Sequence, residues 1–336
     1  MIHLGVADGR LPAAAVAVDG HIVGAATGRD ASGVPWDAIE AAMLRAGVGP
    51  GDIDAVAVAG RFTHVAMRQG LGGSWSDSAG AVAQTLLRAT GLGAVQADQT
   101  AERWERDLAG RGVRPHRVTF FDGLGSLAEA SYRTCPFDDV AILVVEPLVD
   151  GLVAGVFHGV SGQVDRVAAY GPRSTFASVD RQLTAAFGAP LGAGARLDGP
   201  ATDADDDLVP ALVRSFSREG WSSGWQALAA APAQVAGPSA REALAEWLVE
   251  HVSTVLPGLS LAVAGRWFGD AGLVDAMASR RPGLHVGPAG GPARAAIGAA
   301  LRAAGASPDV RSAAEWADLV SGRAAAGVQP GPGPNP

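Results

Sequence analysis

The chain has 336 residues, of which 48% are hydrophobic and 18% are charged, so it can bury a sizeable core and is too weakly charged for a disordered protein. The formal net charge of −8 argues against a nucleic-acid binder that relies on a basic surface. The sequence contains no lysine, and all 26 basic side chains are arginines. This excludes chemistry that requires a lysine, such as Schiff-base formation or the phosphate contact of a P-loop.

The sequence predicts a cytoplasmic protein that does not cross a membrane. No basic stretch followed by a long apolar core opens the chain, and no apolar run reaches about 18 residues. The single cysteine, Cys135, excludes an intramolecular disulfide and a cysteine-cluster metal site.

The first part of the chain predicts a three-stranded antiparallel meander followed by alternating helices and strands. The pairs Asp8-Gly9 and Asp19-Gly20 each separate two short apolar runs, which is a strong hairpin signal. The elements expected are strands at 2–6, 13–18 and 21–27, a helix at 36–45, a strand at 55–59, a loop at 61–78, helices at 81–90 and 100–109, a strand at 118–121 and a helix at 126–134.

A second meander is expected in the middle of the chain, which indicates that a β-rich unit is duplicated. A strand is expected at 141–145, the second meander follows it with strands at 152–158 and 164–170, and mostly helical sequence comes next. The last expected elements are a strand at 261–264, a helix at 270–279, a strand at 285–286, helices at 293–303 and 311–320, and a Pro-Gly-rich tail.

Two glycine-rich loops precede expected helices. Gly123 and Gly125 fit G-x-G-x-x-A after a strand, and Glu146 ends the next strand, so one alternative is a dinucleotide-binding protein. The other explanation is a tight strand-to-helix turn. Gly290, Gly291 and Arg294 form a second loop and first helical turn that can bind an anion, although an ordinary capped turn explains them equally well.

No metal site is predicted. The seven histidines are scattered, and no two of them are three or four residues apart on an expected helix.

The element order resembles that of the actin/sugar-kinase/heat-shock superfamily. The chain resembles more specifically the N-terminal domain of the O-carbamoyltransferases that modify nodulation factors and antibiotics, which is itself similar to the tRNA threonylcarbamoyl-transfer protein. The matching segments are Gly5–Arg10, Gly49–Ala59, Pro136–Asp139, Gly265 and Pro288–Leu301.

The resemblance implies an α/β protein with two lobes, each built on a mixed sheet, and a cleft between them. The expected lobes are residues 1–140 and 141–305, followed by a C-terminal helix at 306–322 and a disordered tail at 323–336. The cleft would be bordered by Gly265 and by the glycine loop before Arg294.

The chain departs from the family where the family's chemistry lies. The histidine metal motif of the family falls on Gly123–Ala128, and its later metal-ligand aspartate falls on Pro292. The phosphate loop falls on Glu146–Asp150, and the two opening histidines fall on Ala7 and Arg10. The resemblance therefore implies a member without metal or cofactor, which acts as the partner subunit of an active carbamoyltransferase or as a homodimer, with no nucleic acid or membrane involved.

Two further expectations concern the cleft. An alternative is an active, metal-independent carbamoyl or acyl transferase that uses Asp8, Asp122 and Asp150 as candidate bases and Arg294 as an anion holder. Trp267 and Phe268 follow Gly265, and either one of them occupies the former nucleotide site or faces a partner, or both are core residues.

Overall fold

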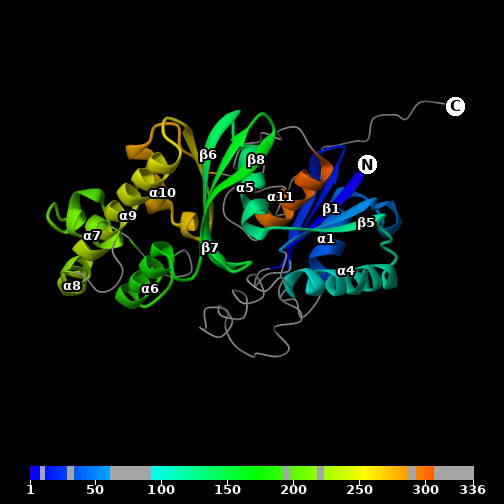
Figure 1. The fold of residues 1–336 in the computed structure, drawn as a ribbon, viewed down its shortest axis with the longest axis horizontal. Coiled ribbons are helices and arrows are strands. Elements are labelled where there is room, and N and C mark those ends of the chain that lie inside the picture. The colour runs from blue at the N-terminus through cyan, green and yellow to red at the C-terminus, as the bar shows by residue number, and fades with distance from the viewer. Residues whose placement is uncertain are drawn as a thin grey trace.

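The structure is a computed structural model that describes residues 1–7, 12–28, 34–60, 92–191, 197, 199–217, 223–286 and 293–305. Its first half forms a five-stranded sheet in the order β3-β2-β1-β4-β5 (Figure 1). The strands β1, β2 and β3 are an antiparallel meander, and β4 and β5 extend the sheet in parallel beside β1. The bounds are β1 Ile2–Ala7, β2 Ala13–Val18, β3 His21–Thr27, β4 Ala55–Ala59 and β5 Arg117–Phe121.

The second half repeats this sheet in the order β8-β7-β6-β9-β10, again with an antiparallel meander and two parallel strands. The bounds are β6 Asp139–Val149, β7 Leu152–Val160, β8 Gln163–Tyr170, β9 Ser260–Gly265 and β10 His285–Val286. The identical strand order and directions confirm the α/β class and the duplicated mixed sheets. This is the arrangement of the actin/sugar-kinase/heat-shock fold.

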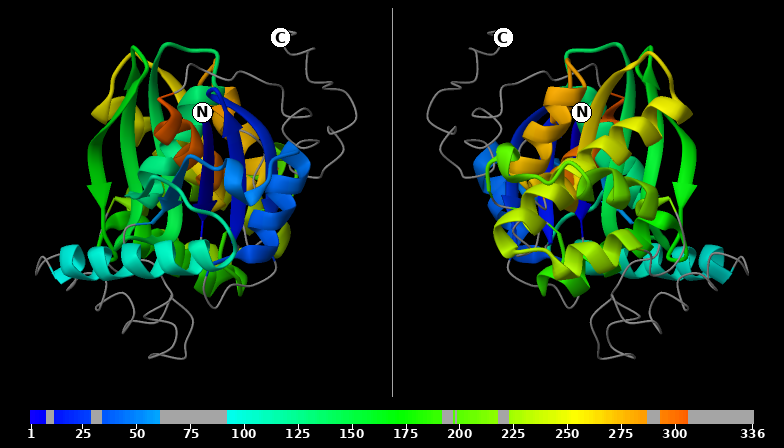
Figure 2. Two further views of the ribbon diagram at one scale, coloured as in Figure 1. Left: turned by 90° about the vertical axis from the view of Figure 1, so that its right-hand side faces the viewer. Right: turned by 90° about the vertical axis from the view of Figure 1, so that its left-hand side faces the viewer.

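Helices form three layers around the two sheets (Figures 1 and 2). One layer covers the outer face of the first sheet, a second covers the outer face of the second sheet, and α5 and α11 lie between the sheets. The bounds are α1 Trp36–Ala46, α4 Leu92–Gly110, α5 Gly123–Thr134, α6 Thr175–Phe187, α7 Leu208–Phe216, α8 Ser223–Ala230, α9 Ala233–Val255, α10 Ala271–Arg280 and α11 Ala293–Ala304, with 3-10 turns η1 Pro50–Asp52, η2 Ala201–Asp203 and η3 Arg266–Gly269. None of the helices in the described part of the chain is both long and apolar enough to span a bilayer.

The two middle helices are exchanged between the halves. α5 follows the first sheet in sequence but packs on β6, β7 and β9 of the second, whereas α11 follows the second sheet and packs on β1, β2 and β4 of the first. A division at residue 140 falls within the first two residues of β6, and it leaves α5 with the first lobe although this helix packs on the second sheet. The expected helix at 306–322 and the tail at 323–336 lie outside the described residues.

Within the described ranges, three two-residue hairpin turns begin with a non-glycine residue in the left-handed region. Asp19, Asp150 and Ser161 have φ of 49°, 53° and 50°, and a glycine with positive φ follows each. This geometry matches the twist of antiparallel strands and explains why Asp-Gly pairs mark the meanders. The turn expected at Asp8-Gly9 lies outside the described residues.

Several predicted elements begin earlier than expected. The predicted helix at 126–134 begins at Gly123, because Asp122 caps it, and the predicted helix at 100–109 begins at Leu92. The strand expected at 141–145 runs from Asp139 to Val149. The predicted loop at 61–78 and the helices at 81–90 and 311–320 lie outside the described residues.

Candidate functional site

The start of α5, which follows β5 of the first sheet, packs against the end of β6 in the second sheet. A Cβ atom on Gly123, the first residue of α5, would lie 2.2 Å from Cγ1 of Val149 at the end of β6. At the neighbouring strand end, Val145 is opposite Gly265 of β9. In α/β sheets, ligands bind outside the carboxyl ends of the parallel strands, so this region is the candidate functional site.

The first turn of α5 is capped by two carboxylates of the chain itself. The N–H of Gly125 donates to Oδ1 of Asp122 at 2.8 Å, and the N–H of Gly123 donates to Oδ2 of Asp150 at 2.8 Å. Oδ2 of Asp122 also pairs with Nη1 of Arg166 on β8 at 3.1 Å. The free N–H groups of a helix start are what a bound pyrophosphate needs, and here two negative side chains hold two of them.

Asp150 is buried and serves the fold in a second way, because it is also the first residue of the β6–β7 turn. Its carboxylate therefore joins this hairpin to the start of α5. The structure brings the candidate bases Asp122 and Asp150 together on one helix end, where both are engaged in capping.

The close approach of β9 to β6 requires a glycine at position 265. Gly265 has φ of 105°, and an added Cβ atom would lie 2.2 Å from the backbone oxygen of Val145. Arg266 follows and pairs with Asp180 of α6 at 3.2 Å.

Trp267 and Phe268 are core residues, 1% and 4% exposed. Nε1 of Trp267 donates to Oδ1 of Asp180 at 3.0 Å, and its ring packs 6.2 Å from that of Phe176. Both aromatic side chains belong to the cluster between the second sheet and the helices α6 to α10. The core alternative therefore holds, and neither ring is exposed toward a partner.

A group of charged side chains that the sequence analysis did not assemble lies at the carboxyl ends of the second sheet. It comprises Glu146 after the buried part of β6, Arg266 after β9, His285 on β10 and Arg294 in the first turn of α11. We call these four residues the arginine–glutamate cluster. The four come from parts of the chain up to about 150 residues apart, so no local motif reveals them.

The electrostatics of this cluster are dominated by burial. Burial raises the pKa of Glu146 from its ordinary 4.5 to about 7, although attraction to Arg266 and Arg294 and a hydrogen bond from the backbone N–H of Arg266 favour the carboxylate. Burial also lowers the pKa of Arg294 to about 10, against the attraction of Glu146. The pKa of His285 is lowered by burial and by the charge of Arg294. The cluster can therefore hold or release a proton at Glu146 near neutral pH.

The remaining predicted site residues fall into two groups. Asp8, Gly290 and Gly291 lie outside the described residues. The positions of the family's metal motif that the structure describes carry Gly123, Leu124 and Leu127, which are buried and offer no metal-binding side chain. Within the described ranges, no three His, Cys, Asp or Glu side chains are grouped as a metal site would require. These residues do not fit the family's metal.

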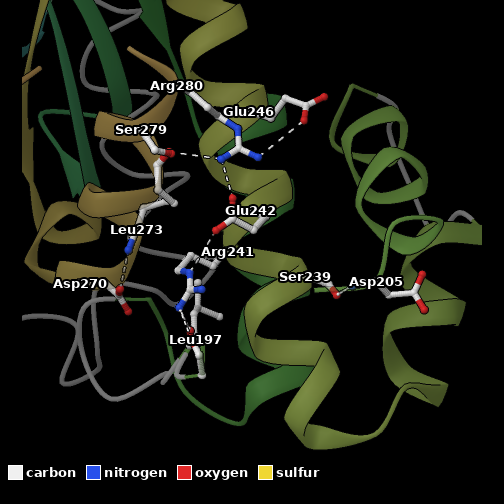
Figure 3. Close-up of polar contacts among 12 residues, drawn as sticks. Leu197, Asp205, Ser239, Arg241, Glu242, Glu246, Asp270, Leu273, Ser279 and Arg280 are labelled. Carbon is white, nitrogen blue, oxygen red and sulfur yellow. Dashed lines mark hydrogen bonds and ion pairs between the residues drawn. The ribbon is translucent and has the colours of Figure 1, made fainter. Parts of the chain in front are cut away.

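A second polar network, centred on Arg241, holds the outer helices together (Figure 3). Arg241 on α9 donates to the backbone oxygens of Leu197 and Gly199 at 3.1 and 2.7 Å. The neighbouring Glu242 pairs with Arg280, which joins α9 to α10. Since the bonds run to backbone oxygens and between neighbouring helices, this network is structural.

No protein-family model matches the sequence, and no curated protein matches it. Among solved structures, the ROK hexokinase from Thermus thermophilus is similar with a TM-score of 0.46 and 15% identity over 90% of this chain and 98% of that chain. The activator of the 2-hydroxyisocaproyl-CoA dehydratase from Clostridium difficile, with bound ADPNP, has a TM-score of 0.46 and 14% identity over 90% and 94%. YeaZ from Pseudomonas aeruginosa has a TM-score of 0.30 and 17% identity over 52% of this chain and 68% of that chain.

Proposed function

We propose that the chain is a carbamoyltransferase-like protein without transferase activity, which acts as the partner subunit of an active carbamoyltransferase in natural-product tailoring. The observation that carries the proposal is the capping of α5. The helix start that corresponds to the family's metal motif holds Asp122 and Asp150 on its N–H groups and has no histidine.

The same capping disfavours nucleotide phosphates at this helix end. A phosphate would have to displace two carboxylates that are already hydrogen-bonded, and would meet their negative charge if they stayed. This applies equally to the dinucleotide alternative, which needs its pyrophosphate at Gly123 and Gly125. Arg166 neutralises Asp122 from the side of β8, which stabilises the capped state.

Titration calorimetry of the pure protein with ATP and magnesium tests the loss of nucleotide binding. We expect a dissociation constant in the millimolar range or weaker for ATP and ADP. NAD(H) and NADP(H) are expected to leave the melting temperature unchanged, because a ligand that binds the native state tightly must raise it. A dissociation constant for ATP in the low micromolar range would overturn the proposal.

Affinity capture of the tagged protein from its native host tests the partner. We expect a transferase-family protein to be recovered, and the purified pair to transfer carbamoyl groups while the chain alone does not. Recovery of the chain alone, together with transfer by the chain from a supplied carbamoyladenylate, would contradict the proposal.

One observation favours the alternative of an active, metal-independent transferase. Glu146, with a pKa of about 7, is suited to proton transfer at neutral pH, whereas Asp122 and Asp150 are engaged as caps. If the alternative holds, the pure protein turns over carbamoyl phosphate, and Glu146→Gln abolishes turnover while Asp122→Asn does not.

A further inference from the structure

Two members of the arginine–glutamate cluster lie on strands of the second sheet, whose inner face α5 covers. Ile142 and Val144 of β6 pack under α5, and Glu146, at the start of the irregular pairing between Val145 and Val149, lies close enough to Arg294 of α11 for their charges to interact. His285 is opposite Ala262, which packs in the same cluster under α5. The side chain of His285 therefore lies on the inner face of the sheet, toward the helices between the lobes.

Arg294 reaches this face from the other half of the molecule. It lies in the first turn of α11, which packs on the first sheet, and it is 4% exposed. A buried guanidinium requires a negative partner, and Glu146 is the carboxylate whose attraction opposes the effect of burial on Arg294. The pair thus lies between the two halves.

Nε of Arg266 and Nε2 of His285 are buried nitrogen atoms of the cluster that have no hydrogen-bond partner among the described residues. Arg266 uses Nη2 for Asp180, so its Nε–H is left for another acceptor. A buried donor without an acceptor destabilises the folded state, and a ligand rich in oxygen atoms would supply the missing acceptor.

The charges determine what such a ligand must be. Arg266 is balanced by Asp180 and Arg294 by Glu146, so with all four ionised these pairs are neutral. When Glu146 takes up a proton, the pair that it forms with Arg294 carries one positive charge, and the protonated carboxyl becomes a hydrogen-bond donor. Because Glu146 ionises near pH 7, that protonated state is accessible under ordinary conditions.

We propose that Arg266, His285, Arg294 and protonated Glu146 bind a small oxyanion, and that the anion is taken up together with one proton. Arg294 supplies the charge, Nε of Arg266 and the ring of His285 supply N–H donors, and Glu146 supplies the proton. Among the described residues, the charged groups that act on Glu146 are Arg266 after β9 and Arg294 on α11, and His285 on β10 is affected by the charge of Arg294. The inference is independent of the proposed function, since an oxyanion can bind whether or not the chain transfers carbamoyl groups.

Titration calorimetry with sulfate and with acetate tests this site, because neither anion changes its charge between pH 6 and pH 8. We expect a saturable heat with at least one of them, and an affinity that falls about tenfold for each pH unit above the ionisation of Glu146. Measurements in two buffers of different ionisation enthalpy should give an uptake of about one proton per anion at pH 8. Sulfate alone binding identifies a tetrahedral anion, and acetate alone binding identifies a carboxylate.

Three variants separate the contributions of Arg294 and Glu146 to anion binding from the general effect of removing a charge. Arg294→Gln should abolish binding, and Glu146→Gln should keep binding but remove its pH dependence, because an amide carries no ionisable proton. Arg111→Gln is the matched control, since this arginine directly after α4 pairs with Glu40 in solvent and the variant should bind like the parent protein. If Arg294→Gln does not fold, the proposal is still decided by two measurements. These are the pH dependence of anion binding to Glu146→Gln and the number of protons that the parent protein takes up per anion. The proposal is overturned if neither anion binds, if the affinity of the parent protein is the same at pH 6 and pH 8, or if a folded Arg294→Gln variant binds normally.

Discussion

Two glycines let backbone meet backbone where the exchanged helix α11 packs. A Cβ atom on Gly5 would lie 2.0 Å from the backbone oxygen of Ala296, and one on Gly298 would lie 1.7 Å from that of Ser126. Real Cβ atoms do not approach this closely, so any side chain forces α11 away from β1 or from α5. The small residues along α11 thus determine the distance between the two halves.

Gly298→Ala is expected to destabilise the protein by about 1–3 kcal/mol, because the added methyl group meets rigid backbone rather than a movable side chain. Chemical denaturation measures the loss. Gly110→Ala, at the end of α4, is the matched control, because a Cβ atom there meets nothing within 4 Å and alanine favours the helix. Equal stabilities of the two variants would show that α11 is not packed as closely as described.

The raised pKa of Glu146 predicts how stability depends on pH. The folded chain holds the proton more tightly than the unfolded chain, in which a glutamate ionises near 4.5. The stabilisation of the folded state that results from this tighter proton binding at Glu146 is therefore fully present below pH 4.5, and it is lost as the pH rises through about 7. Glu146→Gln, which stays neutral, should gain stability relative to the parent protein between pH 5 and pH 8.

Urea denaturation midpoints at unit steps of pH provide the measurement. The matched control is Glu40→Gln, because Glu40 is exposed and pairs with Arg111 in solvent. The difference in urea midpoint between Glu40→Gln and the parent protein should stay nearly constant between pH 5 and pH 8. A constant difference for Glu146→Gln as well would mean that Glu146 is ionised throughout.

At the level of elements, the start of α5 depends on Asp122. The carboxylate accepts the N–H of Gly125, and the backbone oxygen of Asp122 accepts the N–H of Ser126. Asp122→Ala is expected to cost about 1–2 kcal/mol of stability, whereas Asp122→Asn keeps an oxygen acceptor and should lose less than about 1 kcal/mol. Thermal unfolding of the three proteins tests this. A loss in Asp122→Asn as large as in Asp122→Ala would assign the effect to the ion pair with Arg166 rather than to the cap.

The sequence predicts the elements well where local chemistry decides them. Asp19-Gly20 and Ser161-Gly162 mark hairpins because a glycine with positive φ is needed there, and the alternation of short apolar runs marks the two meanders. The sequence predicts a start of α5 three residues after the observed one, because the glycines at positions 123 and 125 disfavour a helix and the cap by Asp122 offsets this. The helix propensities of the individual residues do not include the stabilisation that this cap provides.

The candidate site was only partly predictable for a different reason. Asp122, Asp150, Gly265 and Arg294 were selected, but the sequence suggested neither the caps on α5 nor the pairing of Glu146 with Arg294. The cap by Asp150 and the pair of Glu146 with Arg294 join residues 27 and about 150 positions apart, and they depend on which helix covers which sheet. The exchange of α5 and α11 between the two halves decides which helix covers which sheet, and the local sequence pattern does not encode that exchange.

At the scale of the whole molecule, the exchange makes each half incomplete. The inner face of the first sheet, which includes Ala15, Ala17 and Ala57, packs in one cluster with Ala296 and Ala300 of α11. A fragment of residues 1–138 therefore carries an uncovered sheet and an α5 helix without its own sheet. We expect this fragment alone to aggregate or to unfold without a cooperative transition.

Co-expression of residues 1–138 with residues 139–336 is expected to restore a soluble complex, since all the packing partners are then present. Analytical ultracentrifugation and thermal unfolding of the two preparations measure the difference. A monomeric fragment 1–138 with a cooperative unfolding transition would contradict the role assigned to α11.

The exchange of α5 and α11 also sets the order of events during synthesis. β5 ends at Phe121, but the helix that covers the inner face of its sheet begins at Ala293, so the ribosome must add about 170 more residues first. At ~5–20 residues per second this takes roughly 10–35 s. Throughout that interval the nascent chain presents a largely alanine-lined apolar face, and chaperones that bind such surfaces have ample time to bind it. Folding of the first lobe is thus completed by the last helix that the structure describes, and its yield in the cell is tied to the speed of translation.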